Sequence, residues 1–167
     1  MTEKRNPLGP IGENVRVNVQ RIREEQRLSL AELSRRLDAI GRKIPTLGLG
    51  RVESGERRVD ADDLVALAEV LSVSPATLML PPKDPGEPVK IAEKRSVPWA
   101  TAWRWATGEA PLELRDDPDE RSAQLWQWRL VNRPHKRLRP AATPDEFMIS
   151  EFIEEDREGE KGEGPGR

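Results

Sequence analysis

The sequence predicts an all-α fold, and three observations lead to that expectation. Through the first 80 residues, apolar side chains recur at the three- and four-residue spacing of amphipathic helices. Serine residues suited to helix N-caps stand before two of these stretches, and Gly55 suits the position after the end of a third. A proline-rich break separates this part from the rest of the chain at residues 81–88. Residues 13–80 are therefore expected to form one five-helix domain.

The first two helices follow from apolar spacing and one capping pattern. Residues 13–27 form the first predicted helix. The second begins after Ser29, and Glu32 three residues later completes a capping-box pattern. We extend the second helix to about Gly41. The expected inward positions of this region are Val15, Val19, Ile22, Leu28, Leu30, Leu33, Ser34 and Leu37.

The third helix is expected from Thr46 to Ser54, after a basic loop over residues 42–44. Pro45 cannot lie inside a helix but suits the start of one, and Gly55 suits the position after its end. Leu49 and Val52 would face the core. Two further helices complete the domain, one over residues 60–71 with aspartates in its first turn and a short one after Ser74-Pro75.

This order of elements resembles the Cro/C1-type (XRE family) helix-turn-helix proteins. The residues that carry the resemblance run over 29–37, 49–58 and 63–74. It implies a five-helix, lambda-repressor-like fold whose helix near Thr46–Glu53 enters the major groove of double-stranded DNA. It also implies a transcriptional regulator, more often a repressor, that works as a homodimer.

The chain departs from that family in ways that leave two interpretations open. About five more residues than usual separate Ser34 from Glu53, and Leu30 stands where the family often has glutamine. Either the glycines of the third helix let the backbone approach the duplex, or the surface has lost specific binding. The predicted DNA-contacting residues are Ser29, Arg35, Arg42, Lys43, Thr46, Leu47, Gly48, Gly50, Arg51, Arg57 and Arg58. For Arg57 and Arg58, an internal pair with Glu53 is the alternative.

Charge is distributed unevenly along the chain. Residues 1–58 hold 13 Lys/Arg against 8 Asp/Glu, whereas residues 141–167 hold 3 against 9. A basic front and an acidic back suit a protein that binds a duplex with one face. Ordinary variation in surface charge is the other explanation.

Outside the five-helix domain the sequence predicts four segments. Residues 1–12 form a flexible arm, 81–95 a Pro-rich linker, 96–140 a Trp-rich helical extension, and 141–167 an acidic tail that ends in disorder. The extension holds two predicted helices, over 96–107 and 117–132, and all five Trp. These rings pack the helices together or onto the first domain, form a dimer contact, or stack on unpaired bases. The basic run 132–140 is either a phosphate-contacting arm or a linker. In the tail, an apolar stripe over 147–153 suits docking on the body or on a protein partner, and the acids suit competition with DNA.

Composition argues against catalysis and metal binding. The chain has no Cys, no Tyr and one His, so we expect no enzyme activity, no metal site and no cofactor. No apolar run is long enough to span a bilayer, and no signal peptide is recognised, so a cytoplasmic protein is expected. The alternative function is a protein-interaction module, antitoxin-like or an adaptor, that keeps the helix-turn-helix fold without specific DNA binding.

Overall fold

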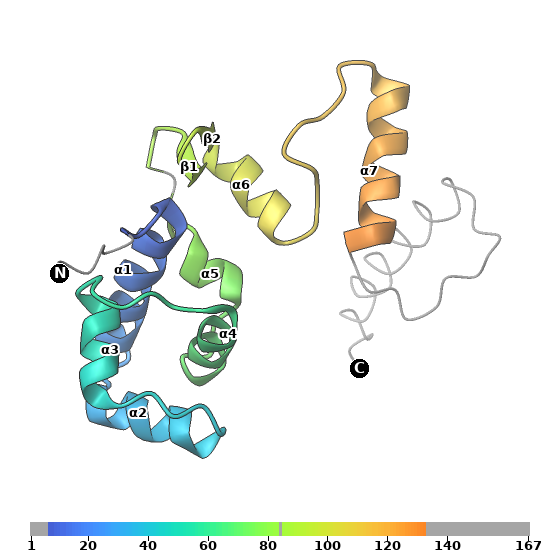
Figure 1. The fold of residues 1–167 in the computed structure, drawn as a ribbon. Coiled ribbons are helices and arrows are strands. Elements are labelled where there is room, and N and C mark those ends of the chain that lie inside the picture. The colour runs from blue at the N-terminus through green and yellow to red at the C-terminus, as the bar shows by residue number, and fades with distance from the viewer. Residues whose placement is uncertain (1–6, 84, 133–167) are drawn as a thin grey trace, which may run out of the picture. The chain divides into compact units, whose positions relative to one another are not determined.

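The computed structural model describes residues 7–83 and 85–132, which form seven helices and one two-stranded sheet (Figure 1). The chain divides into two compact units, the first ending at Glu113 and the second beginning at Leu114. The elements are α1 Pro10–Glu25, α2 Leu30–Ala39, α3 Thr46–Glu53, α4 Ala61–Val70, α5 Pro75–Met79, β1 Val89–Ala92, β2 Arg95–Val97, α6 Trp99–Ala106 and α7 Pro118–Asn132.

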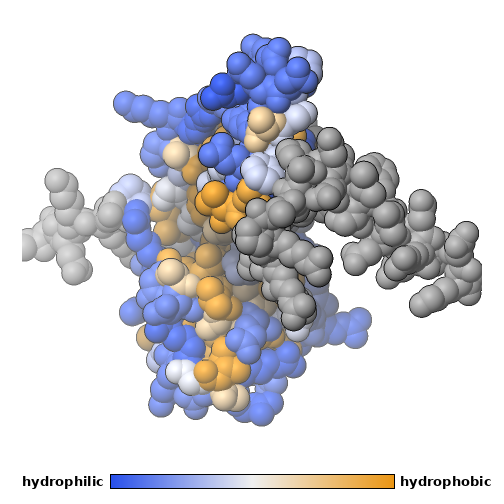
Figure 2. All heavy atoms as spheres, turned by 90° about the vertical axis from the view of Figure 1, so that its right-hand side faces the viewer, coloured by the Kyte–Doolittle hydropathy of each residue, from blue (hydrophilic) through white to orange (hydrophobic). Residues whose placement is uncertain are grey.

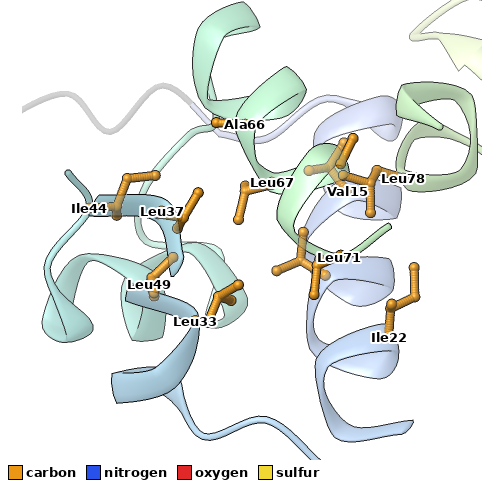
Figure 3. Close-up of a cluster of buried hydrophobic side chains, with 12 residues drawn as sticks. Val15, Ile22, Leu33, Leu37, Ile44, Leu49, Ala66, Leu67, Leu71 and Leu78 are labelled. Atoms are coloured by element: carbon orange, nitrogen blue, oxygen red, sulfur yellow. The ribbon is translucent and has the colours of Figure 1, made fainter. Parts of the chain in front are cut away.

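The five predicted helices are present as α1 to α5, and they enclose one apolar core. Figure 3 shows Leu49 of α3 pointing into the same space as Leu33 and Leu37 of α2. On the other side of that core, Leu67 of α4 and Leu71, the residue that follows α4, are fully buried. The inward positions predicted from the helical spacing are therefore largely confirmed. The exceptions are Leu28, Leu30 and Ser34, which are only partly buried.

The helix ends follow the predicted capping residues with three differences. Helix α2 ends at Ala39 and not at about Gly41, because Gly41 has a left-handed φ of +83°. Helix α1 begins at Pro10, inside the predicted flexible arm, because proline suits the first helical position and Ile11 packs against the core. Ser29 caps α2, its Oγ accepting a hydrogen bond from the Glu32 amide at 3.1 Å. The Glu32 carboxylate does not complete a capping box, because it binds Arg35 and Arg36 instead. Gly55 has a φ of +78°, the left-handed conformation expected after the end of α3.

A buried asparagine that the sequence analysis missed ties α1 to α5. Asn18 is 2% exposed, and its Nδ2 donates to the carbonyls of Leu78 at 3.1 Å and Leu80 at 2.9 Å. Asn14, one turn earlier, donates to the Met79 carbonyl at 3.0 Å. These carbonyls lie at the C-terminal end of a helix, where no backbone partner is available. The amides therefore fix the end of α5 against α1.

The expectation of an all-α fold is wrong in one place, because the predicted linker 81–95 contains strand structure. Strands β1 and β2 pair antiparallel, with Val89 opposite Val97. Both valines are buried in a second apolar cluster with Leu80 and Ala102. Four residues after a run of prolines give too short a pattern to predict a strand, and it is burial against α1 and α6 that stabilises this hairpin.

The first compact unit extends beyond the predicted boundary at residue 80. The indole Nε1 atoms of Trp99 and Trp103 both donate to the Pro81 carbonyl, at 2.9 and 3.1 Å. Both rings pack against the second cluster, which also contains the side chains of Ile11 and Met79 from the five-helix domain. The hairpin and α6 therefore pack onto that domain instead of following a free linker. For Trp99 and Trp103, this agrees with the interpretation that the rings pack onto the first domain.

The second unit is described as far as residue 132, and it contains the predicted helix over 117–132. Asp117 accepts hydrogen bonds from the amides of Asp119 and Glu120, both at 3.0 Å, and so caps α7. The predicted basic run beyond Asn132, the acidic tail and its apolar stripe lie outside the described residues. Among the helices described, none is both long and apolar enough to cross a membrane.

Hydrophilic residues cover much of the face shown in Figure 2, and apolar residues are exposed between them. In the described part of the first unit, several large apolar side chains are more than one third exposed. They are Val17, Ile40, Leu47, Val65 and Trp105. Isolated exposed apolar residues are normal on soluble proteins. Exposure alone therefore does not identify a binding surface, and the position of each residue in the fold must be considered.

We predict that a chain ending after Leu80 unfolds more easily than one ending after Glu113. Leu80 is 1% exposed beneath the hairpin and α6, and exposing such a side chain costs about 1.5–3 kcal/mol. Urea unfolding of the two chains measures the difference. Equal free energies of unfolding would show that the hairpin and α6 do not stabilise the five-helix domain.

Candidate nucleic-acid interface

Helix α3 is a weak helix that its surroundings hold in place. Its two glycines, Gly48 and Gly50, each cost roughly 1 kcal/mol in helix propensity relative to alanine, and Pro45 at its N-cap offers no side-chain hydrogen bond. Leu49 and Val52 are fully buried and fix the helix to the core. The position of α3 therefore depends on contacts made outside the helix itself.

An ion pair between α1 and the last residue of α3 is the first of these contacts. Arg23 Nε donates to Glu53 Oε1 at 2.6 Å and Arg23 Nη2 to Oε2 at 2.9 Å, with side-chain exposures of 13% and 10%. Arg23 Nη1 also donates to the Leu28 carbonyl. These hydrogen bonds to Glu53 raise the pKa of the Arg23 guanidinium. Neither Arg57 nor Arg58 is the partner of Glu53, so that alternative is wrong.

A second set of ion pairs joins the loops on either side of α3 to α4. We call it the Asp63 clasp, made of Asp63, Arg42, Arg57 and Asp60. The Asp63 carboxylate is 1% exposed and accepts from Arg42 Nε at 2.7 Å and from Arg57 Nη2 at 2.7 Å. Arg42 Nη2 also donates to Asp60 at 2.9 Å. A buried carboxylate with two guanidinium partners has its charge compensated in place.

The clasp also perturbs the ionisation of its exposed members. The hydrogen bond to Asp63 raises the pKa of the Arg42 guanidinium. The Asp63 amide donates to the Asp60 carboxylate at 2.7 Å, and this bond, with the charge of Arg42, lowers the pKa of Asp60. Asp60 is also the N-cap of α4. The charged forms of both residues are therefore favoured in the folded domain.

The clasp engages two of the predicted DNA-contacting residues, Arg42 and Arg57, and lies against a third, Gly48. The guanidinium groups of Arg42 and Arg57 are bound to carboxylates inside the domain. A Cβ atom on Gly48 would lie 3.1 Å from Arg57 Nη1 and 3.3 Å from Ile44 Cγ2. Gly48 therefore faces Arg57, and its placement on the outward side of the helix is wrong. Arg58 donates to the carbonyl of Pro7, next to the start of α1.

What remains on the outer side of α3 is a short surface that we call the α3 outer face, made of Thr46, Leu47, Gly50 and Arg51. Thr46, Leu47 and Arg51 are exposed. A Cβ on Gly50 would lie 3.8 Å from Leu30 Cδ1, so this face adjoins the N-terminal end of α2. No hydrogen bond or ion pair to the Arg51 guanidinium is present among the residues that the structure describes. The structure thus separates Arg51 from the arginines that hold the fold.

The other predicted contact residues lie near this face. Lys43 is exposed in the loop before α3, and within the described ranges its ammonium group has no carboxylate partner. The Ser29 hydroxyl is engaged in capping α2. Arg35 is exposed but paired with Glu32 at 2.7 Å, and hydrogen bonds from Arg35 and Arg36 lower the pKa of the Glu32 carboxyl. Over residues 7–83 and 85–132, no cluster of His, Asp or Glu side chains has the arrangement of a metal site.

Comparison with known proteins gives a match that includes α3. A protein-family model described as Helix-turn-helix matches residues 19–78, from within α1 to within α5. This match supports a Cro/C1-type helix-turn-helix domain over these residues. The predicted resemblance is confirmed over this range, which includes the whole of α3. No curated protein and no solved structure matches the chain. The hairpin, α6 and α7 lie outside the matched residues.

We predict that Asp63→Asn destabilises the helix-turn-helix domain by about 1.5–3 kcal/mol, the range for hydrogen bonds to charged groups. Asp62→Asn is the matched control. Asp62 is 84% exposed, and its Oδ2 lies 3.7 Å from Arg42 Nη1, which is too far for a hydrogen bond. Its effect should stay within about 0.5 kcal/mol. Urea unfolding measures both variants, and equal effects would show that the clasp does not hold the domain.

We also predict that the two glycines of α3 respond differently to alanine. Gly50→Ala should stabilise the domain by roughly 1 kcal/mol, because the new methyl group meets only Leu30 at an ordinary contact distance. Gly48→Ala must displace the Arg57 side chain and should lose that gain. Thermal unfolding compares them, and a less stable Gly50→Ala protein would contradict the placement of α3 against α2.

Proposed function

We propose that this protein is a sequence-specific DNA-binding transcriptional regulator that reads the major groove with the α3 outer face. The observation that carries the proposal is the position of Arg51. It is exposed on the recognition helix of a helix-turn-helix domain, while Arg23, Arg42 and Arg57 are held by internal carboxylates. An arginine presented in this way suits a bidentate hydrogen bond to guanine O6 and N7.

Cations around the α3 outer face supply the contacts to the DNA backbone. Lys43 lies just before α3 and is exposed. The ion pairs of Arg35 and Arg36 with Glu32 are also exposed, so these two arginines can exchange the Glu32 carboxylate for a phosphate. Such contacts fix the register of a protein on the duplex, whereas base contacts give the specificity. The proposed mechanism is occupancy of an operator, by binding without catalysis.

The finer parts of the proposal rest on the family resemblance alone. We infer a repressor, because that is the more frequent role in the family. We infer a homodimer, because helix-turn-helix dimers bind half-sites one helical turn of DNA apart. The cytoplasm is the proposed location.

One observation favours a second candidate, a protein-interaction module that lacks specific DNA binding. Leu47 exposes 68% of its surface on the α3 outer face, and Gly50 presents no side chain beside it. A partner protein that buries an apolar side chain suits this arrangement as well. The two candidates differ in one result, which is whether the protein selects a DNA sequence.

Selection from a random duplex library at physiological salt tests the proposal. A specific regulator enriches one motif, and a palindrome gives the half-site spacing of a dimer. Failure to enrich any motif at a protein concentration that saturates nonspecific binding would contradict the proposal and favour the interaction module.

We predict that Arg51→Ala weakens binding to the enriched duplex by about 1–3 kcal/mol and leaves binding to random duplex nearly unchanged. Arg104→Ala is the matched control, since Arg104 is also exposed but lies on α6. Competition binding with the two duplexes gives the ratio. An equal loss on both duplexes from Arg51→Ala would remove its role in reading a base.

A further inference from the structure

Leu47 is the unusual residue of the α3 outer face. The outward side of a surface helix normally carries polar residues, yet this leucine is 68% exposed while Leu49 and Val52 of the same helix are buried. It makes no contribution to either apolar cluster of the domain. The fold therefore gives no reason for an apolar side chain at this position.

The surroundings of Leu47 leave its side chain accessible. Gly50, three residues later on the same side of the helix, adds no atoms that would cover it. Gly48 faces Arg57 and the body of the domain, so it does not screen the outer face. Arg51 is four residues after Leu47, which places the two side chains one helical turn apart on one face.

This pair of side chains matches two chemical features of the major groove. Base edges there present hydrogen-bond donors and acceptors, and the C5-methyl group of thymine is the apolar group among them. A leucine cannot hydrogen-bond, so contact with any other base edge would desolvate a polar group without compensation. Next to an arginine that reads guanine, Leu47 is therefore suited to a thymine methyl group.

We propose that Leu47 is a specificity-determining residue that selects thymine by contact with its C5-methyl group. This proposal rests on the proposed function. Four residues of helix rise about 6 Å, and base pairs are stacked 3.4 Å apart. The thymine that contacts Leu47 therefore lies within about two or three base pairs of the guanine that contacts Arg51.

Deoxyuridine tests this contact, because it differs from thymidine only by the missing methyl group and keeps the same hydrogen-bonding edge. Each thymine of the enriched duplex is replaced in turn, and full-length protein is titrated against each duplex. We expect one position in each half-site at which the loss of the methyl weakens binding by about three- to tenfold, as for burial of one methyl-sized group.

The variant Leu47→Ala links the effect to the side chain. It should bind the thymine and deoxyuridine duplexes equally at that position, and it should fold normally because Leu47 is exposed. Val65→Ala is the matched control, because Val65 is 57% exposed but lies on α4. This variant should keep the full preference for thymine. Urea unfolding of both variants confirms that they are folded.

The outcomes separate this proposal from the proposed function. If a motif is enriched but no thymine is sensitive to deoxyuridine, Leu47 does not read a methyl group and the regulator still stands. If Leu47→Ala keeps the preference for thymine, another residue makes the contact and the proposal is overturned. If no motif is enriched at all, the proposed function fails and the inference fails with it.

Discussion

The proposed DNA interface depends on holding α3, a weak helix by itself, in a fixed position. Helix α3 contains two glycines and lacks a side-chain N-cap, so its own propensity contributes little. Three kinds of contact hold the helix in place. They are the buried side chains of Leu49 and Val52, the ion pair between Arg23 and Glu53, and the Asp63 clasp. Because the clasp binds Arg42 before α3 and Arg57 after it, both ends of the helix are joined to the body.

This arrangement separates the arginines into two classes. The net positive charge of residues 1–58 gives the impression of a broad basic surface. In the folded domain, however, Arg23, Arg42 and Arg57 lie against carboxylates, and their charges are compensated at short distance. The field that a duplex would meet is therefore smaller than the count of cations implies. Arg51 and Lys43 therefore contribute a large share of the positive field near α3, although they are only two residues.

The sequence was sufficient to predict structure that depends on local interactions. The hydroxyl of Ser29, the proline after Ser74 and the glycine at position 55 each act within one helical turn, so their positions in the chain were enough. Gly48 shows the limit of this reasoning. A helical wheel alone placed it outward, whereas the side chain of Arg57, nine residues later, lies over it.

Long-range polar contacts were the part that sequence did not predict. In the sequence, Asp63 is one of three aspartates near the start of the helix predicted over residues 60–71. No neighbouring residue distinguishes it from Asp60 or Asp62. Its role comes from Arg42, which is 21 residues away in the loop before α3. Asn18 likewise acts on carbonyls about 60 residues away. The hairpin was missed for a related reason, since Val89 and Val97 are stabilised by burial against α1 and α6.

The central claim is that the α3 outer face is the surface that meets DNA. Amide chemical shifts of the full-length protein, recorded by NMR with and without an enriched duplex, test it most directly. We predict that the largest changes fall on Lys43 to Arg51 and on the first turn of α2, with small changes on the hairpin and α6. Binding that shifts the hairpin and α6 while leaving α3 unchanged would contradict it.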